Sequence, residues 1–313
     1  MIRKVFFIVL VFCSSLVLAQ QLPHYTQYMF NKIAYNPGYA GVGNGICVGG
    51  LIRQQWVGFR ETDGEGKSST VAPETYVVSI SAPVRALRGG LGATIIQDKI
   101  AYQDNITLNL IYAYQTTLGS GDLGIGLQLS LLNKTIDFSN YHPIVSDDPL
   151  IPQAKSDMIF DAGIGLYYRV PENYYLGVSV LQLLESKTAP DATSTKLKRQ
   201  LNIIGGYELT LPNTPGIDVL PSVMIKTDGS SVQYDFSALL RFKNQFWGGI
   251  SLRYQDAIAL IFGMEYKNFN IGYSYDINTS AIGSYGSHEI RVGYCFKIEV
   301  SKIKKVYRNT RFL

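Results

Sequence analysis

Hydrophobic and polar residues alternate with a period of two along most of this chain, most clearly between Asn105 and Leu131. The apolar positions of that stretch are Ile106, Leu108, Leu110, Tyr112, Tyr114, Leu123, Ile125, Leu127, Leu129 and Leu131. The positions between them are small or polar and uncharged, with Ile111 as an apolar exception. Regular alternation predicts β-strands, and a turn at 116–121 makes this stretch a hairpin. A continuous apolar face opposite a small polar face is typical of a strand between lipid and a crowded, wet interior.

The same pattern recurs and predicts fourteen strands, at residues 46–56, 74–82, 90–97, 105–115, 123–132, 158–169, 174–181, 201–209, 217–225, 232–241, 246–254, 258–266, 269–276 and 288–296. An even number of strands is what a closed single-chain bacterial barrel requires. We therefore expect an all-β fold, a closed antiparallel transmembrane β-barrel. A soluble β-sandwich is the alternative because its strands alternate too, but the recurrence along the whole chain favours the barrel.

Loop lengths provide a second indication of this topology. Four long connections are predicted, at 57–73, 133–157, 183–200 and 277–287, and they all follow odd-numbered strands. The connections after the even-numbered strands are short, for example 170–173. Bacterial barrels have short periplasmic turns and longer outer loops, so we expect the first strand to run outward.

The segments before and after the barrel differ in composition from it. Arg3 and Lys4 precede an apolar run, and we expect residues 1–19 to be a secretory signal peptide cleaved after Ala19. Residues 20–44 form a leader that is periplasmic or plugs the barrel, with one or two helical turns ended by Pro37. The barrel occupies 45–296, and a basic tail, expected in the periplasm, occupies 297–313.

Composition narrows the possible functions. The 22 Tyr suit the aromatic girdles of a barrel, and the 30 Gly suit crowded strand interiors. The net charge of +4 is scattered, so nothing indicates nucleic-acid binding. Ser287, His288 and Glu289 are adjacent in sequence, but on a strand His288 points away from the other two. The sequence therefore predicts no catalytic, metal-binding or cofactor-binding residues, no cofactor, and no enzymatic activity.

Charged residues and cysteines also fall on the inward-facing set. Five charged side chains are expected inside the barrel, namely Asp161, Arg169, Asp276, Glu289 and Arg291. Charges of both signs in a lumen usually pair, and they mark either a polar channel or the contact surface of a plug. Cys47 and Cys295 lie on the first and last strands, which are neighbours in a closed barrel. Because an exported protein meets oxidising conditions, a disulfide across this seam is possible.

Three groups of residues are candidates for binding a protein partner. They are the leader residues Tyr25, Tyr28, Met29 and Phe30, the loop residues Tyr141, Pro143 and Ile144, and the tail residues Lys302, Lys304, Lys305 and Arg308. An exposed apolar patch in a long loop favours a partner. A solvated tail and an ordered leader without a special role are the alternative interpretations.

Several motifs resemble those of the PorP/SprF family. They are the run from Pro23 to Asn31, the run from Asn36 to Gly41, Arg53-Gln54-Gln55-Trp56 with Gly58-Phe59, Asp98-Lys99, Tyr273-Ser274-Tyr275-Asp276, and Ser287-His288-Glu289-Ile290. Gly38 departs from the alanine expected at its position. The resemblance implies an outer-membrane barrel of the type IX secretion and gliding-motility machinery of Bacteroidota, without enzymatic activity.

The resemblance leaves two roles open. One is to help export a secreted protein, or hold it at the surface, through the C-terminal sorting domain of that cargo, which is the role we favour. The other is a core machine component tied to a periplasmic peptidoglycan-binding lipoprotein and to ring components. A passive, porin-like solute channel is the alternative function, and an outer-membrane hydrolase would need a Ser/His/acid geometry that the sequence does not present.

Overall fold

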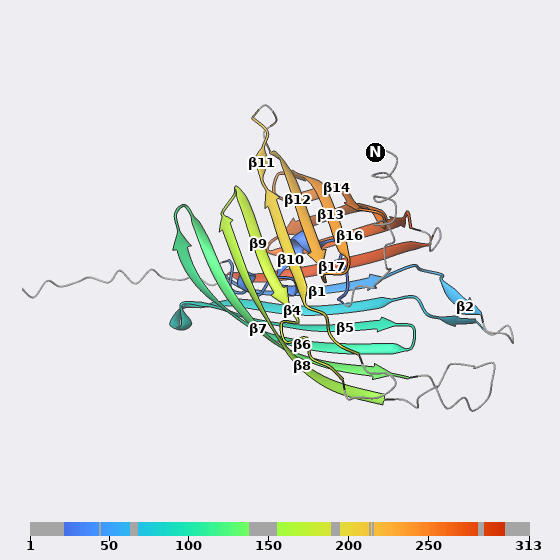
Figure 1. Cartoon of the computed structure of the whole chain (residues 1–313). Coiled ribbons are helices and arrows are strands. Elements are labelled where there is room, and N and C mark those ends of the chain that lie inside the picture. Colours follow the sequence, from blue (N-terminus) through green and yellow to red (C-terminus); the bar gives the residue numbers. More distant parts are fainter. Residues whose placement is uncertain are drawn as a thin grey trace, which may run out of the picture.

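The computed structural model describes residues 22–43, 45–62, 68–137, 155–188, 195–212, 214, 216–280 and 285–297. Fourteen of the described strands form a closed antiparallel barrel (Figure 1). In chain order they are β1 (Gly45–Gln54), β4 (Glu74–Val84), β5 (Gly89–Ile100), β6 (Gln103–Leu118), β7 (Gly121–Ile136), β8 (Lys155–Val170), β9 (Tyr174–Leu181), β10 (Gln200–Tyr207), β12 (Ile217–Thr227), β13 (Val232–Phe242), β14 (Phe246–Arg253), β15 (Ala257–Tyr266), β16 (Phe269–Asn278) and β17 (Gly286–Lys297). The expected fold class is confirmed.

The ring is continuous because each strand pairs with both of its neighbours. Consecutive barrel strands pair with each other, β10 pairs with β12, and β1 pairs with β17. The short β11 (Leu209–Thr210) continues the line of β10 along β12 after a break at Glu208. β2 (Arg60–Thr62) and β3 (Ser68–Thr70) form a separate hairpin within the connection between β1 and β4.

The wall has the two faces that the alternation predicts. Leu110, Leu127 and Leu129 are all more than half exposed on the outside of the barrel, where they suit a lipid surface. Between them, Asn109 and Gln128 are buried on the inside and hydrogen-bonded to each other. No helix in the described part of the chain is long and apolar enough to cross a membrane.

The predicted loop at 133–157 is partly wrong. β7 continues to Ile136 and β8 begins at Lys155, and side chains of Ser156 and Asn133 are hydrogen-bonded across the pair. A strand that extends beyond the apolar belt carries polar residues on both faces. Hydrophobic alternation therefore does not reveal its last residues.

The leader runs inside the barrel and is blue in Figure 1. It forms three short 3₁₀ turns, η1 (Tyr28–Phe30), η2 (Lys32–Ala34) and η3 (Pro37–Tyr39). A fourth, η4 (Arg85–Leu87), lies in the turn between β4 and β5. Pro37 was expected to end the helical turns, but it begins η3, where proline is favoured because its missing N–H has no helical partner anyway. The side chain of Asn36 caps this turn by accepting a hydrogen bond from the Gly38 N–H at 2.8 Å.

Candidate functional site

The leader fills the lumen with bulky side chains. Tyr25, Tyr28, Met29 and Tyr35 are at most 7% exposed. They form one hydrophobic cluster with inward-facing residues of eight strands, which are Leu51, Val77, Ile96, Ile204, Met224, Leu239, Trp247 and Ile261. A barrel whose interior is packed in this way has a core made of leader and wall together.

The apolar exception at Ile111 has its explanation here. Ile111 is 3% exposed and faces the lumen, where it packs with Ile33 and Ala40 of the leader and with Ala113. An isoleucine among polar inward-facing residues thus marks a place where the leader touches the wall.

At the end of the barrel that carries the long loops, the start of the leader is held by charged residues. Glu289 accepts hydrogen bonds from the backbone N–H groups of Thr26 and Gln27, both at 2.8 Å. The Thr26 hydroxyl donates to Asp276 at 2.7 Å and accepts from Arg53 at 2.8 Å. Arg53 also pairs with Asp276 at 2.7 Å and with Glu289 at 3.3 Å. We call these five residues and Arg253 the leader-anchoring network.

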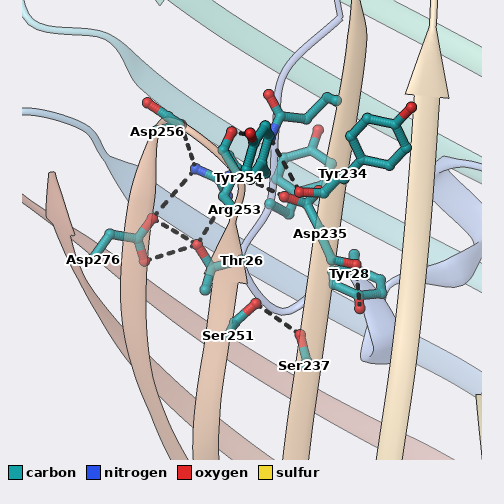
Figure 2. A network of polar contacts seen from close by, with 12 residues as sticks. Thr26, Tyr28, Tyr234, Asp235, Ser237, Ser251, Arg253, Tyr254, Asp256 and Asp276 are labelled. Atoms are coloured by element: carbon teal, nitrogen blue, oxygen red, sulfur yellow. Dashed lines mark hydrogen bonds and ion pairs between the residues drawn. The ribbon is translucent and has the colours of Figure 1, made fainter. Parts of the chain in front are cut away.

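Arg253 extends the network to further strands. Figure 2 shows its guanidinium near Asp256, Asp276 and Thr26, and it also pairs with Asp235 at 3.2 Å. Arg53, Arg253, Asp276 and Glu289 are each at most 6% exposed. Buried charges are tolerated where they are paired and hydrogen-bonded, and removing one partner leaves an unpaired charge at high cost.

The network joins motifs that lie far apart in the sequence. Thr26 belongs to the leader run, Arg53 to Arg53-Gln54-Gln55-Trp56, and Asp276 and Glu289 to the two motifs near the C-terminus. Arg53 faces Glu289 directly across the β1–β17 pair. The alternation of the strands predicts Asp276 and Glu289 inside the barrel, but it does not identify Thr26, Gln27 or Arg53 as their partners. The alternation along β1 places Arg53 on its inward face, and this was the one feature of the sequence that could have identified Arg53.

At the opposite end, which carries the short turns, the leader is held by close backbone contact. A Cβ on Gly126 of β7 would overlap backbone atoms of Pro37 and Gly38, and a Cβ on Gly90 of β5 would overlap those of Gly41. Only glycine permits this approach. We call this contact the glycine cradle.

Two side-chain amides complete the cradle. Asn36 Nδ2 donates to the Leu166 carbonyl at 2.9 Å, and Gln115 Nε2 donates to the Ala40 carbonyl at 2.8 Å. The first bond ties a leader side chain to the backbone of β8, and the second satisfies a leader carbonyl that lacks a strand partner.

His24 lies beside the leader-anchoring network. Its Nδ1 is buried and has no hydrogen-bond partner among the described residues. Burial, followed by the positive charges of Lys226, Arg253 and Arg53, lowers the pKa of His24 well below its usual value of 6.5. The imidazole is therefore neutral while the leader is in place.

A cavity of about 270 Å³ lies between the leader and the wall near the short-turn end. Lys32 of the leader and Arg169 of β8 line it, together with Tyr39, Tyr167 and Tyr175. Lys32 Nζ sits 3.9 Å from the centre of the Tyr175 ring. Burial beside Arg169 and Arg291 lowers the pKa of Lys32 to about 8.

The other predicted inward charges also have defined positions. Asp161 is buried and accepts hydrogen bonds from the backbone N–H groups of Leu184 and Ser186, so it orders the loop after β9. Arg291 donates to Asn270 at 2.7 Å and lies 4.5 Å from the centre of the Phe30 ring. Phe30 is thus partly buried against the wall.

Cys47 and Cys295 are directly opposite each other on β1 and β17 and are joined by a disulfide, with their Cα atoms 4.0 Å apart. Ser287 and Glu289 are buried on the lumen side, whereas His288 points the other way and its Nδ1 lies 2.6 Å from the Tyr273 hydroxyl. Within the described residues there is no group of three potential metal ligands. The candidates Tyr141, Pro143, Ile144, Lys302, Lys304, Lys305 and Arg308 lie outside the described residues, as does the expected signal peptide.

The family model described as type IX secretion system membrane protein PorP/SprF matches residues 17–294. No curated protein sequence matches the chain.

Among solved structures, the chain is similar to the toluene transporter TbuX of Ralstonia pickettii, with 11% identity and a TM-score of 0.48 over 84% of this chain and 93% of that one. The toluene transporter TodX of Pseudomonas putida is 12% identical, with a TM-score of 0.48 over 85% of this chain and 93% of that one. The translocator domain of the autotransporter NalP from Neisseria meningitidis is 14% identical, with a TM-score of 0.40 over 87% of this chain and 93% of that one.

Proposed function

The chain belongs to the PorP/SprF family of type IX secretion system membrane proteins, and from this premise we propose a non-enzymatic barrel, closed by its own leader, that works by binding other proteins. It is an outer-membrane β-barrel of the secretion machinery. Its role is to help export a secreted protein, or to hold that protein at the cell surface, through the C-terminal sorting domain of the cargo. Lipid surrounds the wall.

The leader inside the lumen is the observation that supports this proposal. A solute channel needs a continuous wet path lined by polar groups. Here Tyr25, Tyr28 and Tyr35 are buried in that path, and the leader is bonded to the wall at both ends. A barrel of this kind offers its outer and periplasmic surfaces to partners instead of its lumen.

An aromatic cluster at the long-loop end favours the cargo-binding role. Phe59 packs against Trp56 and against Tyr285, with ring centres 6.3 and 5.5 Å apart. Val57, which follows Trp56 in sequence, is 46% exposed. Its N–H donates to the Gly286 carbonyl at 2.8 Å and so ties the loop to the start of β17. Because long loops face outward in bacterial barrels, an apolar patch here suits a partner at the cell surface.

The test is a mild-detergent pull-down of a tagged copy from its native outer membrane, followed by mass spectrometry. We expect a large secreted protein with a C-terminal sorting domain. Val57→Lys should reduce its recovery several-fold, whereas Leu87→Lys, an equally exposed apolar residue in the short turn η4, should not.

Other outcomes have defined meanings. Recovery of a peptidoglycan-binding lipoprotein and ring components, without cargo, would assign the barrel to the core machine instead. A barrel that comes down alone and conducts ions would contradict both roles and support a solute channel.

A further inference from the structure

The cavity near the short-turn end has a chemistry that closing the lumen does not explain. Its floor is formed by Met29 and Phe30 of the leader, and its walls carry the rings of Tyr39, Tyr167 and Tyr175. The turn after β8, at Pro171 to Asn173, and Glu208 at the end of β10 form its rim. The cavity therefore belongs to the short-turn end, which faces the periplasm in bacterial barrels.

Two of the three cations that line this cavity, Lys32 and Arg169, are incompletely paired. Among the described residues, no carboxylate lies within 4.0 Å of Lys32 Nζ. Arg169 has Asp122 at 3.7 Å, beyond hydrogen-bonding distance, and its Nε is buried without a hydrogen-bond partner. By contrast, Arg241 on the same lining is fully engaged by Glu208 and Asp218. Lys32 thus lacks a carboxylate partner and Arg169 is only loosely paired, so both can donate to an anion that enters the cavity.

The remaining lining selects among anions. The tyrosine rings offer flat apolar surfaces, and an aromatic or aliphatic group of a ligand would replace water there. A cavity of about 270 Å³ admits the end of a peptide chain or a small organic acid but not a folded domain. The Arg169 guanidinium has the planar fork that matches a carboxylate.

We propose that this cavity binds a carboxylate carried on an aromatic or apolar group, with the carboxylate between Lys32 and Arg169 and the apolar group against Tyr39, Tyr167 and Tyr175. The source is the C-terminal residue of a periplasmic peptide chain or a small free acid. This site goes beyond the export role proposed above. It does not involve the long loops, where the cargo is proposed to bind, so its failure would leave that role intact.

The experiment is isothermal titration of the purified full chain in detergent with N-acetylphenylalanine. We expect saturable binding, and at least tenfold weaker binding of N-acetylphenylalanine amide, which has the same ring but no charge. Lys32→Gln and Arg169→Gln should each weaken binding of the acid at least tenfold. The matched control is Arg85→Gln, an exposed arginine at the same end of the barrel, and it should bind like the parent chain.

Two further probes give the site its identity. If acetyl-Gly-Gly-Phe binds as tightly as N-acetylphenylalanine, the site takes peptide ends. If this longer peptide is excluded, the site takes small free acids. Both results support a carboxylate site. Absence of binding by both acids, equal binding of acid and amide, or binding of inorganic phosphate alone would overturn the proposal. Heat-modifiable migration of each variant on a gel shows whether it is folded. Arg169→Gln is the variant that should disturb the core least, because the Arg169 side chain is partly exposed.

Discussion

The two ends of the lumen hold the same leader by different physics. At the long-loop end, Thr26 and Gln27 are bound by a buried network of Arg53, Asp276, Glu289 and Arg253. At the short-turn end, Pro37 to Gly41 press their backbone onto Gly90 and Gly126, with amide hydrogen bonds from wall to leader and back.

This difference separates two kinds of dependence. The leader-anchoring network depends on charge, so it responds to removal of a partner and to protonation. The glycine cradle depends on shape, so it responds to a single added methyl group and is insensitive to salt and pH. Variants that act on one end alone can therefore show which end controls retention of the leader.

Removal of the central arginine should have the largest effect. Arg53→Gln leaves Asp276 and Glu289 without their shared partner, and breaking a buried ion pair costs about 3–5 kcal/mol. Thermal unfolding in detergent should show this loss, and limited proteolysis should cut the leader near Thr26. Lys99→Gln is the control, because it removes an exposed pair with Asp104, worth about 0–1 kcal/mol. Equal stability of the two variants would contradict a structural role for the network.

Overfilling the cradle should have the next largest effect. In Gly126→Ala the new methyl group meets the leader backbone, and overpacking costs about 1–3 kcal/mol. In Gly248→Ala the nearest atom is the Ile261 carbonyl oxygen at 3.6 Å, an ordinary contact. We expect proteolysis near Pro37 to increase in the first variant only, and to the same extent at low and high salt. A salt-dependent increase would mean that the two ends are coupled.

Acid should loosen the charged end by a smaller amount. Burial keeps the pKa of His24 well below 6.5 inside the lumen, whereas a released leader has a histidine of ordinary pKa. Above about pH 7 the His24 imidazole is neutral both in the closed barrel and in a released leader, so it makes no pH-dependent difference between these two states. Below about pH 6.5 the released state gains a proton, which costs the closed state up to about 1.4 kcal/mol per pH unit. The difference in unfolding temperature between the parent chain and His24→Gln should therefore be smaller at pH 5 than at pH 8. Unfolding temperatures that change with pH in parallel for the two chains would refute this role of His24.

The seam disulfide should affect neither end. Cys47 and Cys295 join β1 to β17, whose pairing runs over the full length of β1. The denatured mature chain should contain no free thiol before reduction and two after it. Reduction of the folded barrel should leave proteolysis of the leader unchanged, and release of the leader by reductant would show that the seam controls the plug.

The wall could be predicted from the sequence because alternation is local. Lipid on one face and a crowded lumen on the other impose a period of two on every strand, and the fourteen strands follow from it. The strand ends at Ile136 and Lys155 did not follow, because beyond the lipid both faces are polar.

The site could be predicted only in part because its contacts are not local. Alternation placed Asp276 and Glu289 inside the barrel, but their pairing with Thr26 and Arg53 depends on the leader entering the lumen. The sequence left open whether the leader is periplasmic or a plug. Ile111 was visible as an exception, and its partners Ile33 and Ala40 became clear only with the leader in place.

The most direct test of the account is the ionic conductance of the purified barrel in a planar bilayer, measured for the full mature chain and for a chain lacking residues 22–41. Heat-modifiable migration on a gel establishes that both are folded. We predict no steady conductance for the full chain and open-channel currents for the shortened one. Steady conductance of the full chain, equal to that of the shortened chain, would contradict a lumen closed by the leader and restore the solute channel as the function.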